Sequence, residues 1–273
     1  MKVFISADLE GIAGVVHGEH VFRDGREHDR ARKLMTAEVN AAIEGALEAG
    51  AEKIVVNDSH GTMRNIIPEE LHEKAELITG SPKPLSMMQG IDSSFNAAFF
   101  IGYHAMPSSF PAVMGHTYYG RVTYNVRING RLMGETGLNA ALAGYFNVPV
   151  VLVTGDQAVT AEARQLIENI ETVTVKEAVG RYAAKCLSPV EARKRIREAA
   201  KTALNKLPNI KPFRLYSPVT FEVDFVHAGM TEMALLVPGV EKGGSRTVKF
   251  TFDDLLTAFK AFRAILALAS LNV

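Results

Sequence analysis

The sequence predicts an α/β fold in which helices flank a mostly parallel sheet, with an inserted hairpin and a smaller α+β region towards the C-terminus. Up to residue 176, short apolar segments typical of strands alternate with segments long enough for helices, which is the spacing of βαβ units. Residues 121–128 interrupt this order with the alternating pattern of a two-sided strand. Asn129-Gly130 follows directly and is the strongest short signal for a hairpin turn.

Compact apolar segments predict the strands of the parallel sheet at residues 3–6, 54–57, 97–101, 150–153 and 172–176. Residues 28–49 carry apolar side chains at the spacing of an amphipathic helix, and Gly50 marks its C-terminal stop. Further helices are predicted at 138–145 and 159–167. These helices separate successive strands, as the crossover connections of a parallel sheet require.

The pattern changes after residue 186. Ser188, Pro189 and Glu191 predict the start of a basic helix at 192–207, as its N-cap, first-turn proline and N3 acid. Two strands at 219–225 and 247–252 and an apolar closing helix at 253–271 follow without βαβ spacing, as the printed sequence shows. We therefore expect two domains, residues 1–186 and residues 187–273, of which the second is α+β and has a role in oligomerisation.

Composition excludes several classes of protein. Thirty basic side chains balance thirty acidic ones, so the chain lacks the concentrated positive charge that binding to nucleic acid or a membrane surface requires. A single cysteine, Cys186, cannot form an internal disulfide or a thiolate cage, so any metal must be bound by His, Asp or Glu. No secretion signal or membrane-spanning segment is recognisable, which predicts a cytoplasmic protein.

Acidic and imidazole side chains follow three of the predicted strands at the points where these strands end. Asp8 and Glu10 follow the first strand, His60 follows the second and His104 follows the third. Ligands bind at the carboxyl ends of parallel strands, so these side chains are expected at one edge of one sheet. Glu135 lies on the return arm of the hairpin, just before a helix, and can reach the same edge. The sequence therefore predicts a metal centre within residues 1–186.

Two histidines and three carboxylates suit borderline cations such as Zn²⁺, Mn²⁺ or Co²⁺. Five ligands are one too many for a tetrahedral site that keeps a position open. They suit two metals about 3.5–4 Å apart that share a bridging carboxylate, as in two-metal hydrolases. Such a pair would activate a water molecule and polarise a scissile carbonyl.

Short motifs occur in order along nearly the whole chain: Ser6-Ala7-Asp8-Leu9-Glu10-Gly11, Asn57-Asp58-Ser59-His60, Gly102-Tyr103-His104-Ala105, Gly134-Glu135-Thr136-Gly137-Leu138-Asn139-Ala140, Leu187-Ser188-Pro189 and Val237-Pro238-Gly239. Each motif is weak alone, but the ordered set resembles the D-aminopeptidase family of di-zinc metallopeptidases. Residues 16–25 depart from the family pattern. Their His17 and His20 are expected on a mobile loop that could alter access to the site.

The resemblance implies that two zinc ions are bound by Asp8, Glu10, His60, His104 and Glu135. It implies that Asp8 bridges the two ions, and the catalytic histidine of the family matches His116 in Met114-Gly115-His116. It also implies an aminopeptidase that hydrolyses short peptides with a D-residue at the free N-terminus. The family forms ring-like homodecamers, so the same assembly is expected here.

Several of these residues also have plain structural interpretations. Asp8 and Glu10 could be a helix N-cap and a first-turn acid, and Glu135 could be an acid that the helix dipole stabilises. Asp156 is better interpreted as the N-cap of the following helix than as a ligand. Asp58 is expected to brace the His60 loop rather than to bind metal.

Other functions are compatible with the same ligands. A metal-dependent amidohydrolase or phosphoesterase would act on a different small substrate, although the sequence has no phosphate-binding Gly-rich loop. A peptide-binding accessory of a transporter would bind peptides without turnover. The sequence has no G-x-S-x-G motif, which disfavours serine hydrolysis.

Overall fold

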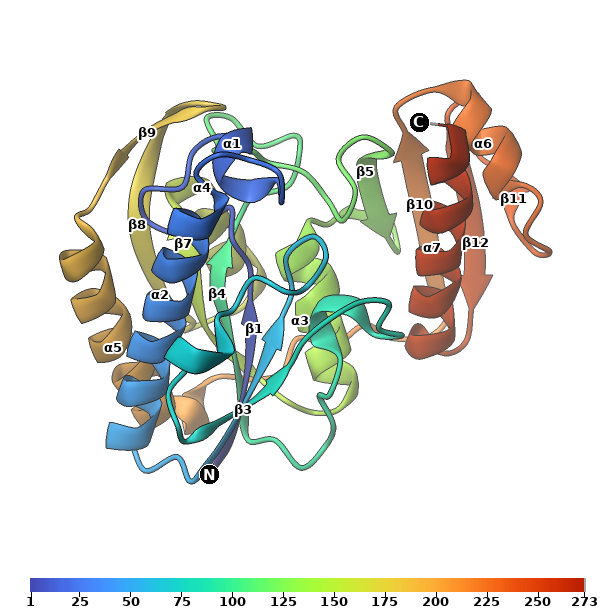
Figure 1. Cartoon of the computed structure of the whole chain (residues 1–273). Coiled ribbons are helices and arrows are strands. Elements are labelled where there is room, and N and C mark those ends of the chain that lie inside the picture. Colours follow the sequence, from blue (N-terminus) through green and yellow to red (C-terminus); the bar gives the residue numbers. More distant parts are fainter. Residues whose placement is uncertain (273) are drawn as a thin grey trace.

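A computed structural model describes residues 1–272 and confirms the α/β class. The larger sheet has seven strands in the order β3-β2-β1-β4-β7-β8-β9 (Figure 1). All are parallel except β9, which pairs antiparallel with β8. The strands are β1 (Lys2–Ala7), β2 (Lys53–Asp58), β3 (Ala75–Ile78), β4 (Ala97–Tyr103), β7 (Val150–Asp156), β8 (Glu171–Gly180) and β9 (Ala183–Cys186).

Helices cover both faces of this sheet. On one face, α2 (His28–Glu48) packs on α5 (Pro189–Asn205), and on the other α3 (Glu135–Tyr145) packs beside α4 (Gln157–Leu166) (Figure 1). Because both faces are covered, β4 and β7 are buried along their whole length. This explains why they occur in the sequence as continuous apolar segments rather than as alternating ones.

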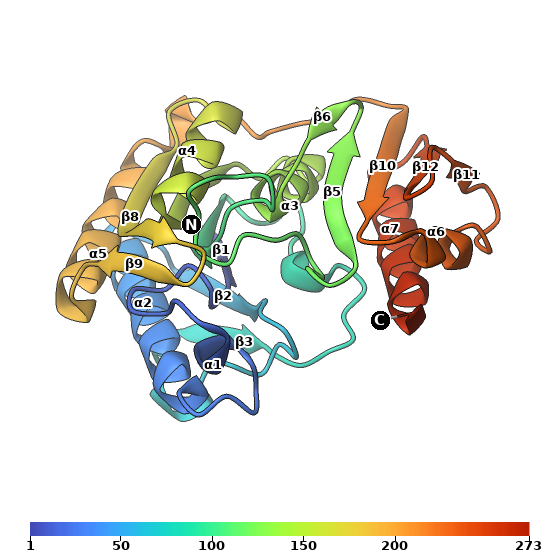
Figure 2. The same ribbon diagram turned by 90° about the horizontal axis from the view of Figure 1, so that it is seen from above.

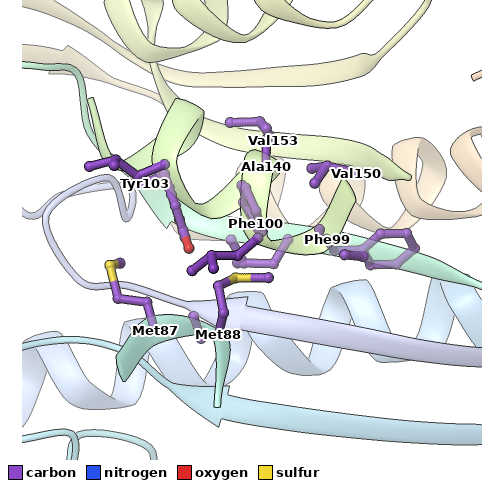
Figure 3. Packing of buried hydrophobic residues seen from close by; sticks show 14 of the residues in the cluster. Met87, Met88, Phe99, Phe100, Tyr103, Ala140, Val150 and Val153 are labelled. Atoms are coloured by element: carbon purple, nitrogen blue, oxygen red, sulfur yellow. The ribbon is translucent and has the colours of Figure 1, made fainter. Parts of the chain in front are cut away.

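The core lies between the sheet and these helices. Figure 3 shows Phe99 and Phe100 of β4 in this core, together with Val150 and Val153 of β7. The rings of Phe100 and Tyr103 stack with their centres 4.5 Å apart. The aromatic packing therefore continues along β4 to its carboxyl end, where the predicted ligands begin.

A second sheet is antiparallel and has five strands in the order β11-β12-β10-β5-β6 (Figure 2). Its strands are β5 (Thr123–Ile128), β6 (Arg131–Leu132), β10 (Val219–Phe225), β11 (Glu241–Lys242) and β12 (Thr247–Phe252). Asn129 and Gly130 have φ values of 50° and 77°, as a type I′ turn requires, so the predicted hairpin is confirmed. The sheet packs against α7 (Leu255–Ala269), which lies beside α6 (Ala228–Ala234).

The division into residues 1–186 and 187–273 stays a prediction, and two packing arrangements cross it. First, α5 lies against α2 so closely that a Cβ on Gly45 would be 2.1 Å from the carbonyl oxygen of Arg197. Second, the β5–β6 hairpin pairs with β10, where Val126 lies opposite Val223. A helix from the second predicted domain therefore packs on the first, and a hairpin from the first completes the small sheet of the second.

The remaining elements are short. They are α1 (Gly18–Val21) and the 3-10 helices Pro68–Glu70, Ser86–Met88, Leu207–Asn209 and Ser270–Asn272. The sequence did not indicate β3, β9, α1 or α6, because so few residues show no clear periodicity. Within the described residues, no helix is both long enough and apolar enough to cross a bilayer.

Candidate metal centre

The order of the strands brings the predicted ligands together. β1 lies between β2 and β4, and all three run in parallel, so their carboxyl ends meet at one edge of the sheet. Asp8 and Glu10 follow β1, His60 follows β2 and His104 follows β4, as predicted. Glu135 reaches the same edge as the first residue of α3. All five side chains are buried.

Close approach of two backbone segments fixes the turn after β1. The N–H of Gly11 donates to the carbonyl of Gly102 at 2.7 Å, and that of Asp8 donates to Ile101 at 2.8 Å. A Cβ on Gly11 would lie 2.0 Å from the carbonyl oxygen of Tyr103. Glycine is therefore required after Glu10 for the β1 loop to lie against the end of β4.

Two histidines lie among the three carboxylates. His60 Nδ1 is 2.8 Å from Glu10 Oε2 and 3.3 Å from Asp8 Oδ1. His104 Nε2 is 3.5 Å from both Asp8 Oδ2 and Glu135 Oε1. The two oxygens of Asp8 thus face different histidines, and this carboxylate lies in the middle of the cluster.

The outer nitrogen of each histidine is fixed by a backbone carbonyl. His60 Nε2 donates to Val21 at 2.8 Å, and His104 Nδ1 donates to Ala105 at 3.0 Å. A ring that donates through its outer nitrogen presents a free electron pair on the inner one, as metal-binding histidines do. The carbonyl that orients His60 comes from Val21 at the end of α1.

The donor set fits divalent cations. Asp8 Oδ2 and His104 Nε2 are buried without a hydrogen-bond partner among the described residues. Candidate ligand atoms lie within 4.8 Å of one another in two groups that share His104, one with Asp8 and Glu10 and the other with His116 and Glu135. Oxygen and imidazole donors in this arrangement suit zinc and similar ions.

The charges of the cluster also favour the binding of cations. Burial, and then the charge of Glu10, raise the pKa of Asp8 to about 7. Burial also acts to raise the pKa of Glu10 and Glu135, but the neighbouring imidazoles outweigh it and lower both values. Three buried carboxylates can all remain charged at low cost only where positive charge lies among them.

His116 lies against this cluster. Its ring stacks on that of His104 with 4.0 Å between ring centres, and its Nε2 is 3.8 Å from Glu135 Oε1. Its Nδ1 donates to the carbonyl of Met114 at 3.0 Å. Burial, and then the charge of His104, lower the pKa of His116, so the neutral ring is favoured near pH 7. The geometry is compatible with proton transfer and with metal binding.

The cluster opens into a cavity of about 1040 Å³. One wall contains His17 and Gly18 from the segment around α1, and another contains Tyr118 together with Arg263 and Leu266 of α7. The cavity thus lies between the large sheet and the unit built on the small sheet. Its size is sufficient for a small-molecule ligand.

Two buried charged residues that the sequence did not indicate hold the β1 loop. The ammonium of Lys176 on β8 donates to the carbonyls of Glu10, Ile12 and Val15. Glu38 of α2 accepts the N–H of Ala13 at 2.9 Å. The local sequence offered no clear signal, because Lys176 lies at the end of a predicted strand that also contains Thr172 and Thr174. Its partners lie more than 160 positions away in the chain.

Other sequence-based interpretations have clear outcomes. Asp58 braces the His60 loop as expected, because its carboxylate accepts the backbone N–H groups of Asn65 and Ile66. Asp156 is the N-cap of α4, as expected. The expectation of a loop is wrong for His20, which lies in α1 and is buried with its Nε2 2.8 Å from the carboxylate of Glu27.

Known proteins resemble this chain along nearly its whole length. The sequence pattern of the D-aminopeptidase family matches residues 1–264. A D-aminopeptidase of Bacillus subtilis (strain 168) is 41% identical over 273 residues, which cover 98% of each chain. The solved structure of the Zn-dependent D-aminopeptidase DppA from Bacillus subtilis, described as a self-compartmentalizing protease, matches with a TM-score of 0.96. The two chains are 40% identical, and the match covers 99% of this chain and 98% of that one.

Lys176→Met is expected to lower the thermal midpoint and to weaken zinc binding, because three buried carbonyls lose their donor. An unsatisfied buried group costs about 1–3 kcal/mol. Thermal unfolding and zinc titration check this expectation. The control is Lys185→Met, which removes an exposed lysine 3.6 Å from Glu177 and should have little effect. Equal behaviour of the two variants would show that Lys176 does not hold the loop.

Proposed function

Because the chain belongs to the D-aminopeptidase family, we propose that it is a zinc aminopeptidase that removes the N-terminal residue from short peptides and prefers a D-residue there. One observation carries this proposal. Asp8, Glu10, His60, His104 and Glu135 come from separate parts of the chain and are buried in contact at the carboxyl edge of the sheet.

The donor set supports two zinc ions per chain. Glu10 and His60 would hold one ion, His104 and Glu135 would hold the other, and Asp8 would contribute to both. The division rests on Asp8, because its Oδ1 faces His60 and its Oδ2 faces His104. Mn²⁺ or Co²⁺ would suit the same donors. When bound, the ions would polarise the scissile carbonyl and lower the pKa of the attacking water.

In this proposal His116 transfers the proton. Its Nδ1 is bonded to the carbonyl of Met114, so in the neutral ring the free electron pair is on Nε2, which faces the cluster. The lowered pKa keeps the ring ready to accept a proton near neutral pH. Nε2 would take a proton from the attacking water and return it to the leaving amine, as a general base and then a general acid.

We also propose that the chain assembles into a homodecamer and acts in the cytoplasm. The solved relative is described as self-compartmentalizing. The apolar side chains of α7 are not evidence for this assembly, because Phe259 and Phe262 are buried within the chain itself. The support is the self-compartmentalizing relative, because exposed apolar side chains such as Phe110, Tyr216 and Leu236 also occur singly on monomeric proteins.

Purified protein prepared with excess zinc is expected to retain close to two zinc ions per chain. It should hydrolyse D-alanylglycine faster than L-alanylglycine, and chelation should abolish turnover until zinc is restored. Metal analysis and initial rates on one preparation measure both properties. A chain without zinc, or one that cleaves aryl phosphates and not the aminoacyl compounds, would contradict the proposal.

Variants of two ligands provide a matched comparison within this experiment. Asp8→Ala is expected to lose more metal than Glu10→Ala, because a carboxylate between both ions serves both. An Asp8→Ala protein with two ions and full turnover would remove Asp8 from the centre.

His116→Ala is expected to keep both zinc ions and to lose about 10²–10⁴-fold in kcat, the usual contribution of a general acid or base. Metal content and kinetics must be measured on the same preparation. Loss of an ion would show that His116 is a ligand. Near-normal turnover with both ions bound would show that it is neither a ligand nor the proton carrier.

Sedimentation at micromolar protein concentration is expected to give a species of ten chains, because the solved relative is described as self-compartmentalizing. A stable species of 29.7 kDa would refute assembly. Such a result would leave the metal chemistry unaffected.

A further inference from the structure

Outside the metal cluster, the cavity wall carries positive charge only. Among the described residues that line the cavity, the acidic ones are Asp8, Glu10 and Glu135, all within the cluster. The same wall contains four arginines, Arg23, Arg121, Arg181 and Arg263. A ligand in this cavity therefore meets cationic side chains wherever it extends away from the cluster.

Arg263 differs from the other three arginines. Arg23 and Arg121 are exposed, and the guanidinium of Arg181 already donates to the carbonyl of Gly115 at 3.0 Å. Arg263 is half-buried, and no carboxylate within residues 1–272 forms an ion pair with it. Its guanidinium carbon lies 5.2 Å from the centre of the Tyr118 ring, a cation–π contact.

Tyr118 connects this guanidinium to the metal centre. Its N–H donates to Glu135 Oε1 at 2.6 Å, and its hydroxyl donates to Asn139 at 2.7 Å. Phe259 and Phe262 pack against its ring, with ring centres 5.8 and 5.5 Å away. The backbone, hydroxyl and ring of Tyr118 are therefore all held, and this one residue contacts both Glu135 of the cluster and Arg263.

We propose that Arg263 binds the C-terminal carboxylate of the substrate and so selects very short peptides with a free C-terminus. This inference rests on the proposed aminopeptidase function. A guanidinium supported by an aromatic face binds carboxylates with two parallel hydrogen bonds. A peptide lengthens by about 3.3–3.6 Å per residue, so only a chain of a few residues keeps its carboxylate on the same wall.

A peptide amide lacks the charge that this site requires. It would cover the half-buried guanidinium of Arg263 without neutralising it, and sites built for a polar partner discriminate strongly against ligands that lack it. The structure therefore assigns a length and end-group preference to a residue of α7, whereas the metal ligands lie on the large sheet and on α3.

The test compares D-alanylglycine with D-alanylglycinamide, which differ only at the C-terminus. The zinc-loaded wild type is expected to favour the acid by roughly 10- to 100-fold in kcat/KM, mostly through KM, as for a lost charge-assisted hydrogen bond. Arg263→Ala should remove this preference by slowing the acid while the amide rate is kept. Arg263→Lys should retain part of the preference, because an ammonium is a point charge without the planar fork.

Arg121→Ala is the matched control, because it removes the same charge from an exposed position in the same cavity. It should keep the wild-type preference. Equal loss of preference in both variants would show a diffuse positive field and overturn the assignment to Arg263. An equal decrease in kcat/KM for the acid and the amide in Arg263→Ala would show a structural role through Tyr118. This result would also overturn the assignment to Arg263.

The wild-type protein distinguishes failure of the proposed carboxylate site from failure of the proposed aminopeptidase function. Equal turnover of acid and amide refutes the carboxylate site and leaves the aminopeptidase function standing. No turnover of either compound by zinc-loaded protein refutes both the function and the site. Zinc content and thermal midpoints of all variants show whether each one is folded and metallated.

Discussion

Three carboxylates buried within reach of the same two histidines are the constraint on which the rest of this structure depends. Like charges repel strongly in a poorly solvated interior, and burial first and the charge of Glu10 second raise the pKa of Asp8 to about 7. His60 and His104 offset part of it, and divalent cations are the groups best suited to offset the remainder. The surrounding backbone must also prevent Glu10 and Glu135 from moving out to water, where each would be more stable.

The fold meets this requirement by supporting the ligand loops with other buried polar groups. Lys176 closes the loop after β1 through three backbone carbonyls, and Glu38 binds an N–H group of the same loop. Asp58 does the same for the loop after β2. The carbonyl of Val21 in α1 orients His60, so this short helix also supports the site. Burying a charge is costly unless hydrogen bonds offset the lost hydration, so these supporting residues are restricted in what can replace them.

The second sheet has a different role. Its β5–β6 hairpin leaves the large sheet, pairs with β10 and returns to α3, which begins at Glu135 (Figure 2). The unit built on this sheet therefore faces the cluster, and α7 contributes Arg263 and Leu266 to the cavity. Tyr118 lies where the two parts meet, bonded to Glu135 through its backbone and packed against α7 through its ring. One sheet thus positions the chemistry, and the other shapes the space in which a substrate lies.

Most elements of the large sheet could be predicted from the sequence alone. The same holds for the hairpin at Asn129-Gly130 and for the residues that surround Asp8 at the carboxyl edge. These predictions are possible because strand and helix periodicities are local, and because parallel strands with crossover helices must end at the same edge. Short elements such as β3 and α6 were too brief to show a period. Two contacts are visible only in the tertiary structure: the hairpin pairs with the C-terminal strands, and Lys176 supports the backbone at Glu10. The tertiary structure also decided that Arg263 lies over Tyr118. These contacts join residues far apart in the sequence. Local sequence patterns reveal helices and strands, but they do not show which distant residue a buried charge will contact.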